Sequence, residues 1–462
     1  MKNIVSRFRL YILPIIQLSI PPVAISSGRA VDLFSDSSFF PVAVWLQSPS
    51  NATAYKATGV NLYVGLWEGP TRDQLDKLKS SGMPVLCNQN EFALANLETY
   101  EDVIAGWMHG DEPDNAQSDG SGGYGPCIDP DTIIARYARW KSNDPERPVY
   151  LNLGQGVSNI DYIGRGSECH ARTDMYPRYI EGCDIASYDI YPVNSRYDLI
   201  RGNLWYVAKG IDSLRMWCDD LKETWCWIEC TRIDSSSSAV PLPDQVKAEV
   251  WMALIHGAKG FGYFCHSWYG GFKEAGWLND AEMKGAITAI NTRIAALAPV
   301  LNSTPVSGTV TVEPGAASSP VAVTIRNHAG SIYIFAVAMR GDATSGTFSI
   351  SGLTGTTSVE VLDEYRTLTA VDGMFQDDFS GYGVHLYKVN TTAGVRCRPI
   401  AGRYVDEKSP RIVPVIQGRT RLDAIDKMSI VYTIHGRCIK RLPDCNSGEF
   451  RASDCIYILQ VR

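Results

Sequence analysis

Short apolar segments alternate with amphipathic ones from about residue 38 to residue 300, and this alternation constrains the fold more than any other feature. Each short segment is a near-continuous apolar run, which is typical of a strand buried on both faces of a parallel sheet. Eight such runs occur: Phe39–Gln47, Gly59–Trp67, Met83–Asn88, Val103–His109, Pro148–Leu153, Asp184–Tyr191, Thr224–Glu229 and Gly260–His266. The intervening segments have apolar residues at helical spacing, as in Arg72–Ser80, Asp129–Ser142, Leu204–Leu221, Pro243–His256 and Asp280–Leu301. Eight strand-then-helix units predict an α/β fold, a closed (β/α)8 TIM barrel over residues 28–303.

The pattern changes after Ser303. The next segments are short, rich in Val, Thr, Ile and Gly, and tend to alternate between apolar and polar residues: Gly308–Val312, Val321–Arg326, Ile332–Met339, Gly346–Ile350, Ser358–Val361 and Gly383–Lys388. Such segments predict a β-sandwich of six to eight strands over residues 304–390.

The last stretch, residues 391–462, begins as a linker and continues with strand-like runs in Met428–Arg437 and Cys455–Arg462. This arrangement resembles the C-terminal sorting domains of exported bacterial enzymes. A small β-module without a sorting role explains the same pattern, so both interpretations stay open.

The N-terminus has the composition of an export signal. Lys2, Arg7 and Arg9 form a positive region, Leu10–Ala24 is mostly apolar, and Ala24-Ile25-Ser26 is a small-x-small cleavage motif. The apolar run is short and interrupted by prolines, whereas a membrane span needs about 20 residues. We therefore expect residues 1–27 to be a signal peptide, no membrane span, and a secreted or cell-surface protein.

Composition narrows the class of protein. A hydrophobic content of 45% and a charged content of 20% describe a globular chain, and a formal charge of −7 argues against a nucleic-acid partner. The 11 Trp and 23 Tyr suit sugar stacking, although a hydrophobic core and a β-sandwich domain also contain aromatic residues. A mononucleotide-binding loop, a His-Glu-x-x-His motif and a nucleophile elbow are all absent from the sequence. We expect no metal and no cofactor.

The 12 cysteines divide by position. Those on predicted barrel strands are expected to be buried free thiols: Cys87, Cys226, Cys230 and Cys265. Cys127 with Cys169, or Cys183 with Cys218, are candidate disulfides because export permits them. The pairing of Cys438, Cys445 and Cys455 cannot be read from the sequence.

Two predicted barrel strands end on a carboxylate. Trp107–Pro113 places Glu112 after the fourth strand, and Trp225–Glu229 places Glu229 at the end of the seventh. Residues at the carboxyl ends of barrel strands form the active site of such folds. Two carboxyl groups facing each other across a cleft are the groups that hydrolyse a glycosidic bond.

On these residues the barrel resembles the clan A retaining glycoside hydrolases, which carry an acid/base after strand four and a nucleophile at strand seven. The resemblance covers about 260 residues and implies that Glu112 is the acid/base and Glu229 the nucleophile. The family commonly has Asn-Glu where this chain has Asp111-Glu112. Asp111 accepts a bond from a sugar hydroxyl but cannot donate one as an amide does, and it is an alternative proton donor.

Each glutamate also has a structural interpretation. In this interpretation, Glu112 is a charge partner for the N-terminus of a helix. Glu229 is within reach of a salt bridge to Arg232. We expect Tyr191, on the same strand face as Asp189, to donate a hydrogen bond to Glu229.

Further candidates for substrate binding follow from their places at strand ends. Trp268, just past the eighth strand, is where the family commonly places an aromatic platform for sugar stacking. The remaining candidates are Asp111, Asp189, His266, Asn152, Trp67, Asn88 and Trp45. For any single one, core packing or a place on a surface loop is an equally good explanation.

The sequence thus predicts an exported retaining glycoside hydrolase acting on a β-linked poly- or oligosaccharide by double displacement. A glycan-binding barrel without hydrolytic activity and a transglycosylase using the same two glutamates are the alternatives. The expected partner is a carbohydrate, and the oligomeric state is left open.

Overall fold

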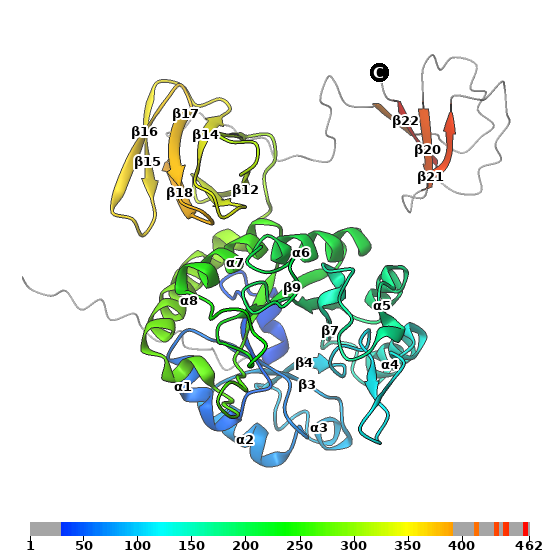
Figure 1. The fold of residues 1–462 in the computed structure, drawn as a ribbon. Helices are drawn as coiled ribbons and strands as arrows, with labels where there is room; N and C mark the ends of the chain where they lie inside the picture. Colours follow the sequence, from blue (N-terminus) through cyan, green and yellow to red (C-terminus); the bar gives the residue numbers. More distant parts are fainter. Residues whose placement is uncertain (1–28, 391–410, 415–428, 434–437, 443–455, 461–462) are drawn as a thin grey trace, which may run out of the picture. The chain divides into compact units, whose positions relative to one another are not determined.

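The computed structural model describes residues 29–390 and four strands of the C-terminal segment, 411–414, 429–433, 438–442 and 456–460 (Figure 1). The chain divides into two compact units, Met1–Arg396 and Cys397–Arg462. The expected signal peptide, its cleavage motif and the linker lie outside the described residues.

The first unit begins with the expected closed barrel, in which the strand order is β1-β10-β9-β8-β7-β4-β3-β2 and every pairing is parallel. Its strands are β1 (Val42–Trp45), β2 (Leu62–Val64), β3 (Val85–Cys87), β4 (Ile104–Met108), β7 (Val149–Leu153), β8 (Ile185–Asp189), β9 (Glu223–Glu229) and β10 (Gly260–Phe264). Seven lie within the predicted runs, and β9 begins one residue before its run, at Glu223. A two-stranded hairpin, β5 (Gln117–Ser118) with β6 (Tyr124–Gly125), is inserted after β4.

One helix follows each barrel strand, and the helices form the outer ring in Figure 1. They are α1 (Ala52–Lys56), α2 (Arg72–Ser81), α3 (Glu91–Ala95), α4 (Pro130–Asn143), α5 (Tyr176–Glu181), α6 (Tyr206–Trp217), α7 (Pro243–Ile255) and α8 (Ala281–Leu301). Local signals set their ends: Thr71 and Gln74 form a capping box at α2, which stops at Gly82 in the left-handed conformation. Asp280 is the N-cap of helix α8, and its carboxyl accepts a hydrogen bond from the Met283 amide.

Side-chain alternation divides the barrel core into two layers. Along β9, Trp225 and Trp227 point into the barrel, while Cys226 and Ile228 pack against the helices. The two indoles fit because they pair in register with Gly260 and Gly262 of β10, where a Cβ would overlap the rings.

An antiparallel sheet follows the barrel, with the order β11-β14-β17-β16-β15-β18-β13-β12. Its outer strands β11 and β12 also contact each other, so the expected β-sandwich is a nearly closed sheet. The strands are β11 (Val310–Pro314), β12 (Val321–His328), β13 (Ser331–Ala338), β14 (Thr344–Ile350), β15 (Thr356–Val361), β16 (Arg366–Val371), β17 (Met374–Phe379) and β18 (Val384–Asn390). The β16–β17 hairpin was not among the predicted strands, although its Asp372-Gly373 turn is a strong hairpin signal.

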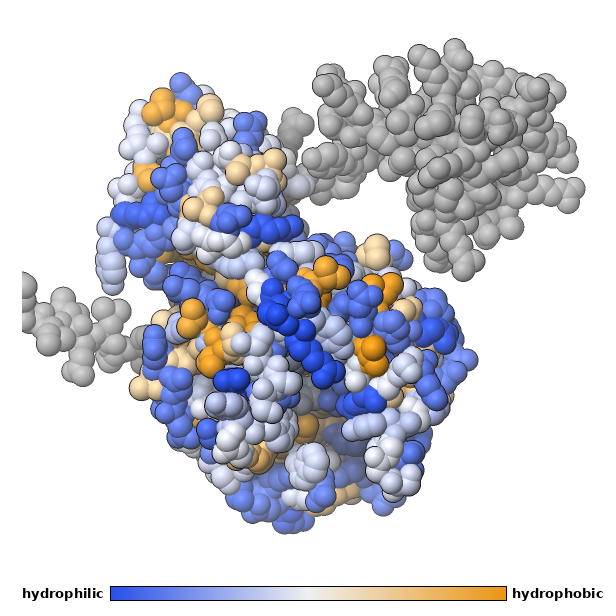
Figure 2. All heavy atoms as spheres, in the orientation of Figure 1, coloured by the Kyte–Doolittle hydropathy of each residue, from blue (hydrophilic) through white to orange (hydrophobic). Residues whose placement is uncertain are grey.

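The sheet shares a core with the barrel helices. Trp251 of α7 packs on Phe335 of β13 with 5.2 Å between ring centroids, and Arg293 of α8 forms an ion pair with Asp363. On the face shown in Figure 2 the surface is mainly hydrophilic, with small scattered hydrophobic spots. None of the helices described is long and apolar enough to cross a membrane.

The second unit contains an antiparallel sheet with the order β19-β22-β20-β21. Its strands are β19 (Arg411–Pro414), β20 (Ser429–Thr433), β21 (Cys438–Leu442) and β22 (Ile456–Gln460). Each of the two strand-like runs predicted in this region contains a strand, β20 in the first and β22 in the second, and a sorting role remains a prediction.

Candidate active site

A cavity of about 360 Å³ opens at the carboxyl ends of the barrel strands, where active sites of this fold lie. Its walls are both aromatic and acidic. The lining residues are Trp45, Asp111, Glu112, Asn152, Gln155, Tyr162, Gly164, Asp189, Tyr191, Asn194, Ser195, Arg196, Tyr197, Trp227, Ile233, Asp234, Ser236, Ser237 and Phe264.

Three carboxyl groups meet at one side of this cavity. Asp111 and Glu112 follow β4, and Asp189 is the last residue of β8. Asn152 of β7 lies between them, since its Nδ2 is 3.0 Å from Asp111 Oδ1 and 3.4 Å from Asp189 Oδ1. The side chains of Asp189 and Glu112 are within hydrogen-bond reach of each other. Two chain segments far apart in sequence thus bring these acids together.

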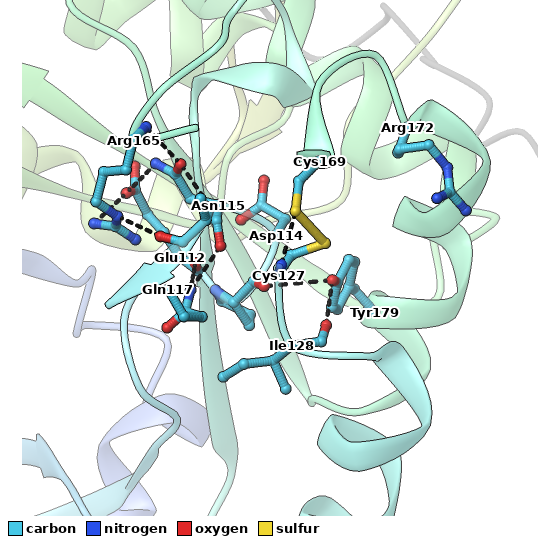
Figure 3. The surroundings of a disulfide bond; sticks show 12 residues. Glu112, Asp114, Asn115, Gln117, Cys127, Ile128, Arg165, Cys169, Arg172 and Tyr179 are labelled. Atoms are coloured by element: carbon cyan, nitrogen blue, oxygen red, sulfur yellow. Dashed lines mark hydrogen bonds and ion pairs between the residues drawn. A yellow bond between two sulfur atoms is a disulfide. The ribbon is translucent and has the colours of Figure 1, made fainter. Parts of the chain in front are cut away.

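Two donors fix the position of the Glu112 side chain. Its Oε2 is 3.1 Å from Arg165 Nη1 and accepts a hydrogen bond of 2.9 Å from Asn115 Nδ2 (Figure 3). The backbone of Glu112 is left-handed, with φ of 43°, a conformation that costs energy in a residue with a side chain and is common at functional sites.

The surroundings of Asp189 differ from those of Glu112. It is buried, and burial followed by the charge on Glu112 raises the pKa of Asp189 well above its ordinary value. Tyr191, on the same strand face, lies beside Asp189, and burial followed by the charge on Asp189 raises the pKa of the Tyr191 hydroxyl well above its ordinary value. Asp189 therefore favours its protonated form.

The neighbouring aspartates add to this asymmetry. Burial by the surrounding protein, followed by the charge on Glu112, raises the pKa of Asp111. The residue nevertheless keeps exposed surface at the cavity. Asp114 accepts hydrogen bonds from the Gly154 amide and the Tyr176 hydroxyl, and burial raises its pKa to about 7. The cluster is thus rich in carboxyls that resist ionisation.

Glu229 does not reach the cavity, so the expectation that it faces Glu112 across a cleft is wrong. It is 0% exposed, whereas Glu112 keeps 8% of its surface. Its oxygens accept three hydrogen bonds, from the Val193 amide at 2.6 Å, the Asn194 amide at 2.8 Å and Asn194 Nδ2 at 2.6 Å. The loop after β8 folds over the end of β9 and covers the carboxyl.

The predicted partners of Glu229 are also replaced. Tyr191 contacts Asp189 instead, and the Arg232 guanidinium lies 4.0 Å from the centre of the Tyr269 ring. The neighbour of Glu229 is Glu249, a fully buried residue of α7. Burial raises the pKa of Glu229, and the hydrogen bonds from Val193 and Asn194 oppose this rise. Burial, followed by the charge on Glu229, raises the pKa of Glu249 well above its ordinary value, so Glu249 is the carboxyl of the pair that favours the proton.

Asn194 connects Glu229 to the cavity wall. Its side chain donates to the Thr231 carbonyl and accepts from the Ile233 amide, so it joins the loop after β8 to the loop after β9. Both loops line the cavity. Glu229 therefore supports the shape of the site through Asn194.

The other candidates divide by position. Trp45, Asn152, Asp189 and Tyr191 line the cavity as expected, whereas Trp67, Asn88, His266 and Trp268 do not. Trp67 and Asn88 are exposed at the ends of β2 and β3.

His266 and Trp268 lie beside the cavity rather than in it. His266 is buried against Gln47 at 3.1 Å, and Trp268 is 51% exposed. Both rings lie next to Phe264, which lines the cavity. Trp268 is thus placed to extend the aromatic wall outward.

Four residues that loops contribute to the site were not predicted from the sequence: Asn115, Tyr162, Arg165 and Asn194. The spacing of Asn115, three residues after Glu112, was an available signal. Arg165 and Tyr162 come from a stretch without regular periodicity, where the sequence does not indicate which side chains turn inward.

Cys127 and Cys169 form a disulfide near this site, which is one of the expected pairings (Figure 3). Cys183 and Cys218 are free, and so are the four strand cysteines, as predicted. Among the residues that the structure describes, no group of His, Cys, Asp and Glu side chains is arranged to hold a metal ion.

No protein-family model matches the sequence, and no curated protein matches it. Among solved structures, a GH30 endoxylanase from Clostridium papyrosolvens C71 aligns at 11% identity with a TM-score of 0.42, covering 76% of this chain and 96% of that one. A family 51 alpha-L-arabinofuranosidase from Bifidobacterium longum aligns at 11% and 0.44, covering 77% and 96%. A putative alpha-galactosidase from Bacteroides fragilis aligns at 8% and 0.45, covering 76% and 79%.

Proposed function

From the geometry of this cavity we propose that the protein is a glycoside hydrolase that uses Glu112 and Asp189 as its working pair. Hydrolysis of a glycosidic bond needs one carboxylic acid that protonates the leaving oxygen and one carboxylate that acts on the anomeric carbon or activates a water. The observation that carries the proposal is the meeting of two cavity carboxyls with different surroundings: Glu112 is bonded to Arg165 and Asn115, whereas Asp189 is buried and has a raised pKa.

The roles follow from these surroundings. Asp189, buried and beside a negative charge, is the proton donor, and Glu112, bonded to Arg165 and Asn115, is the carboxylate. This reverses the acid role that the sequence resemblance implied for Glu112 and replaces Glu229 as its partner. Asp111 adjoins Glu112 and is bonded to Asn152, so it is placed to accept a bond from a sugar hydroxyl.

The walls of the cavity suit a carbohydrate. Aromatic rings of Trp45, Tyr162, Tyr197, Trp227 and Phe264 surround the acids and offer faces to sugar C–H groups. A β-linked substrate and retention of configuration are part of the proposal. Retention is proposed because the Glu112 and Asp189 side chains lie next to each other, and the two carboxyl groups of retaining enzymes are nearer together than those of inverting enzymes, which leave room for a water.

Export is also proposed. The N-terminal composition supports it, and so does the Cys127–Cys169 disulfide, because disulfides persist in oxidising compartments.

The test is a panel of α- and β-linked aryl glycosides and polysaccharides, read by released sugar. We expect Glu112→Gln and Asp189→Asn each to lose about 10²–10⁴-fold in turnover. Asp212→Asn is the matched control, because Asp212 pairs with His256 away from the cavity. NMR of the first product anomer then reports retention or inversion.

Three results would redirect the proposal. Binding of a glycan by the parent without turnover indicates a glycan-binding barrel. Products transferred to an added sugar acceptor indicate a transglycosylase. Parental activity in Asp189→Asn removes Asp189 from the mechanism.

A further inference from the structure

Two loops flank Glu112. The first, residues 112–128, is called the Glu112 loop, and the second, residues 154–175, is called the Arg165 loop. The Arg165 loop contains three short 3-10 turns, and residues 160–175 of it include no buried residue, although the structure describes all of them. A stretch without buried side chains is not held by core packing, so its conformation depends on specific cross-links.

Arg165 is one such cross-link, and it acts at three points. Its Nη1 is 3.1 Å from Glu112 Oε2, its Nε donates to the Ala116 carbonyl at 2.9 Å, and its backbone amide donates to Asn115 Oδ1 at 3.0 Å. Asn115 in turn donates to the same Glu112 oxygen. Arg165 therefore holds Glu112 both directly and through Asn115, as Figure 3 shows.

The second cross-link is the disulfide. Cys127, at the end of the Glu112 loop, is bonded to Cys169, four residues after Arg165. The bond closes a loop of 42 residues, and its Cα atoms are 5.9 Å apart. It restricts how far the exposed 160–175 stretch moves away from Glu112.

We propose that Arg165 is a positioning residue for Glu112 and that the Cys127–Cys169 disulfide keeps Arg165 in place, so that the disulfide supports catalysis and not only stability. This inference rests on the proposed role of Glu112. A misplacement of about 1 Å in a reacting group lowers turnover by about 10²-fold, so a loosened Arg165 loop has a measurable effect.

The experiment compares the full-length parent with Arg165→Gln, Arg165→Lys and the double variant Cys127→Ser/Cys169→Ser. Arg172→Gln is the matched control, since Arg172 lies in the same loop but pairs with exposed Asp174. We expect kcat/KM to fall about 100-fold in Arg165→Gln and about 10-fold in the double variant, mainly through kcat. Arg165→Lys recovers part of the loss because it keeps the charge, and Arg172→Gln keeps the parental value.

Hydrogen exchange gives a readout that does not require activity. In Arg165→Gln and in the double variant, we expect peptides from residues 160–175 to exchange at least about 10-fold faster, while peptides from β4 and β7 stay at the parental rate. A double variant that melts earlier but keeps the parental kcat/KM, or the parental exchange in 160–175, overturns the inference. A parent that is inactive on every glycan removes the proposed function instead, and the exchange comparison still decides whether Arg165 and the disulfide hold this loop.

Discussion

Substitution of Glu229 by Gln separates the two roles that this residue can have. As a nucleophile it would lose almost all turnover without unfolding. As the buried support of the loop after β8, it would lose stability first, because its carboxylate accepts three N–H donors and has 0% exposure. The structure favours the second outcome.

The expected loss follows from the hydrogen bonds. Glutamine keeps one acceptor oxygen, which is able to retain both bonds from Asn194. Its NH₂ group then meets the Val193 amide, so one charge-assisted bond is lost and two buried donors oppose each other. The lost bond is worth about 1.5–3 kcal/mol and an unsatisfied buried group costs about 1–3 kcal/mol. We expect the free energy of unfolding to fall by about 3–5 kcal/mol.

Thermal unfolding measures this change, with Glu223→Gln as the matched control at the other end of β9. The Tm of Glu229→Gln should fall by roughly 10 °C, whereas kcat of the folded protein should fall less than about 10-fold. Azide added to the variant should not restore turnover, since no covalent nucleophile has been removed.

The opposite pattern would refute this reasoning. A Glu229→Gln protein with the parental Tm, a loss of at least about 10³-fold in turnover and a glycosyl azide product would identify Glu229 as the nucleophile. The cavity would then have to open over the end of β9 when substrate binds.

Three further predictions follow from the same cavity. The kcat/KM value should fall as pH rises, because Asp189 must be protonated. Asp111→Asn should move this fall in kcat/KM to lower pH, because it removes a charge that raises the pKa of Asp189. A fall at the parental pH would contradict the role of Asp189 as the proton donor. The free energy of unfolding should fall as pH rises from about 4 to about 7, because Asp114, with a folded pKa of about 7 against 3.8, holds a proton there that the unfolded chain has released. The urea midpoint of Asp114→Asn should fall less steeply with pH across that range than the midpoint of the parent. Equal pH dependence in the two proteins would count against the raised pKa of Asp114. Trp268→Ala should weaken oligosaccharide binding by about 10-fold with little change in kcat on short aryl glycosides, because the indole is 51% exposed beside Phe264 and each aromatic contact is worth about 0.5–1.5 kcal/mol. Calorimetric titration with an oligosaccharide checks this, and an equal loss in kcat on the short substrates would place Trp268 in the reacting site.

Much of the barrel was predictable because its signals are local. Each strand is an apolar run of its own, and each helix carries its own periodicity and caps, as at Thr71 and Asp280. The missed β16–β17 hairpin has polar strands on a curled sheet, so its apolar pattern is weak and only the Asp372-Gly373 turn marks it.

The candidate site was predictable in part. Barrel topology places the residues after β4 and at the end of β8 at one rim, which is why Glu112, Asp189 and Tyr191 were found. Arg165 and Asn115 were missed because the conformation of a loop decides where their side chains point, and no sequence periodicity predicts that conformation.

The sequence alone determined that one carboxylate follows β4 and another ends β9, since strand length and alternation are properties of the local chain. The tertiary structure decided which of them faces solvent. The amides of Val193 and Asn194 cover Glu229, while the turn after β4 leaves Glu112 open to the cavity. The physical reason is that a buried carboxylate is stable only where N–H donors converge on it, and those donors come from a loop more than thirty residues away along the chain.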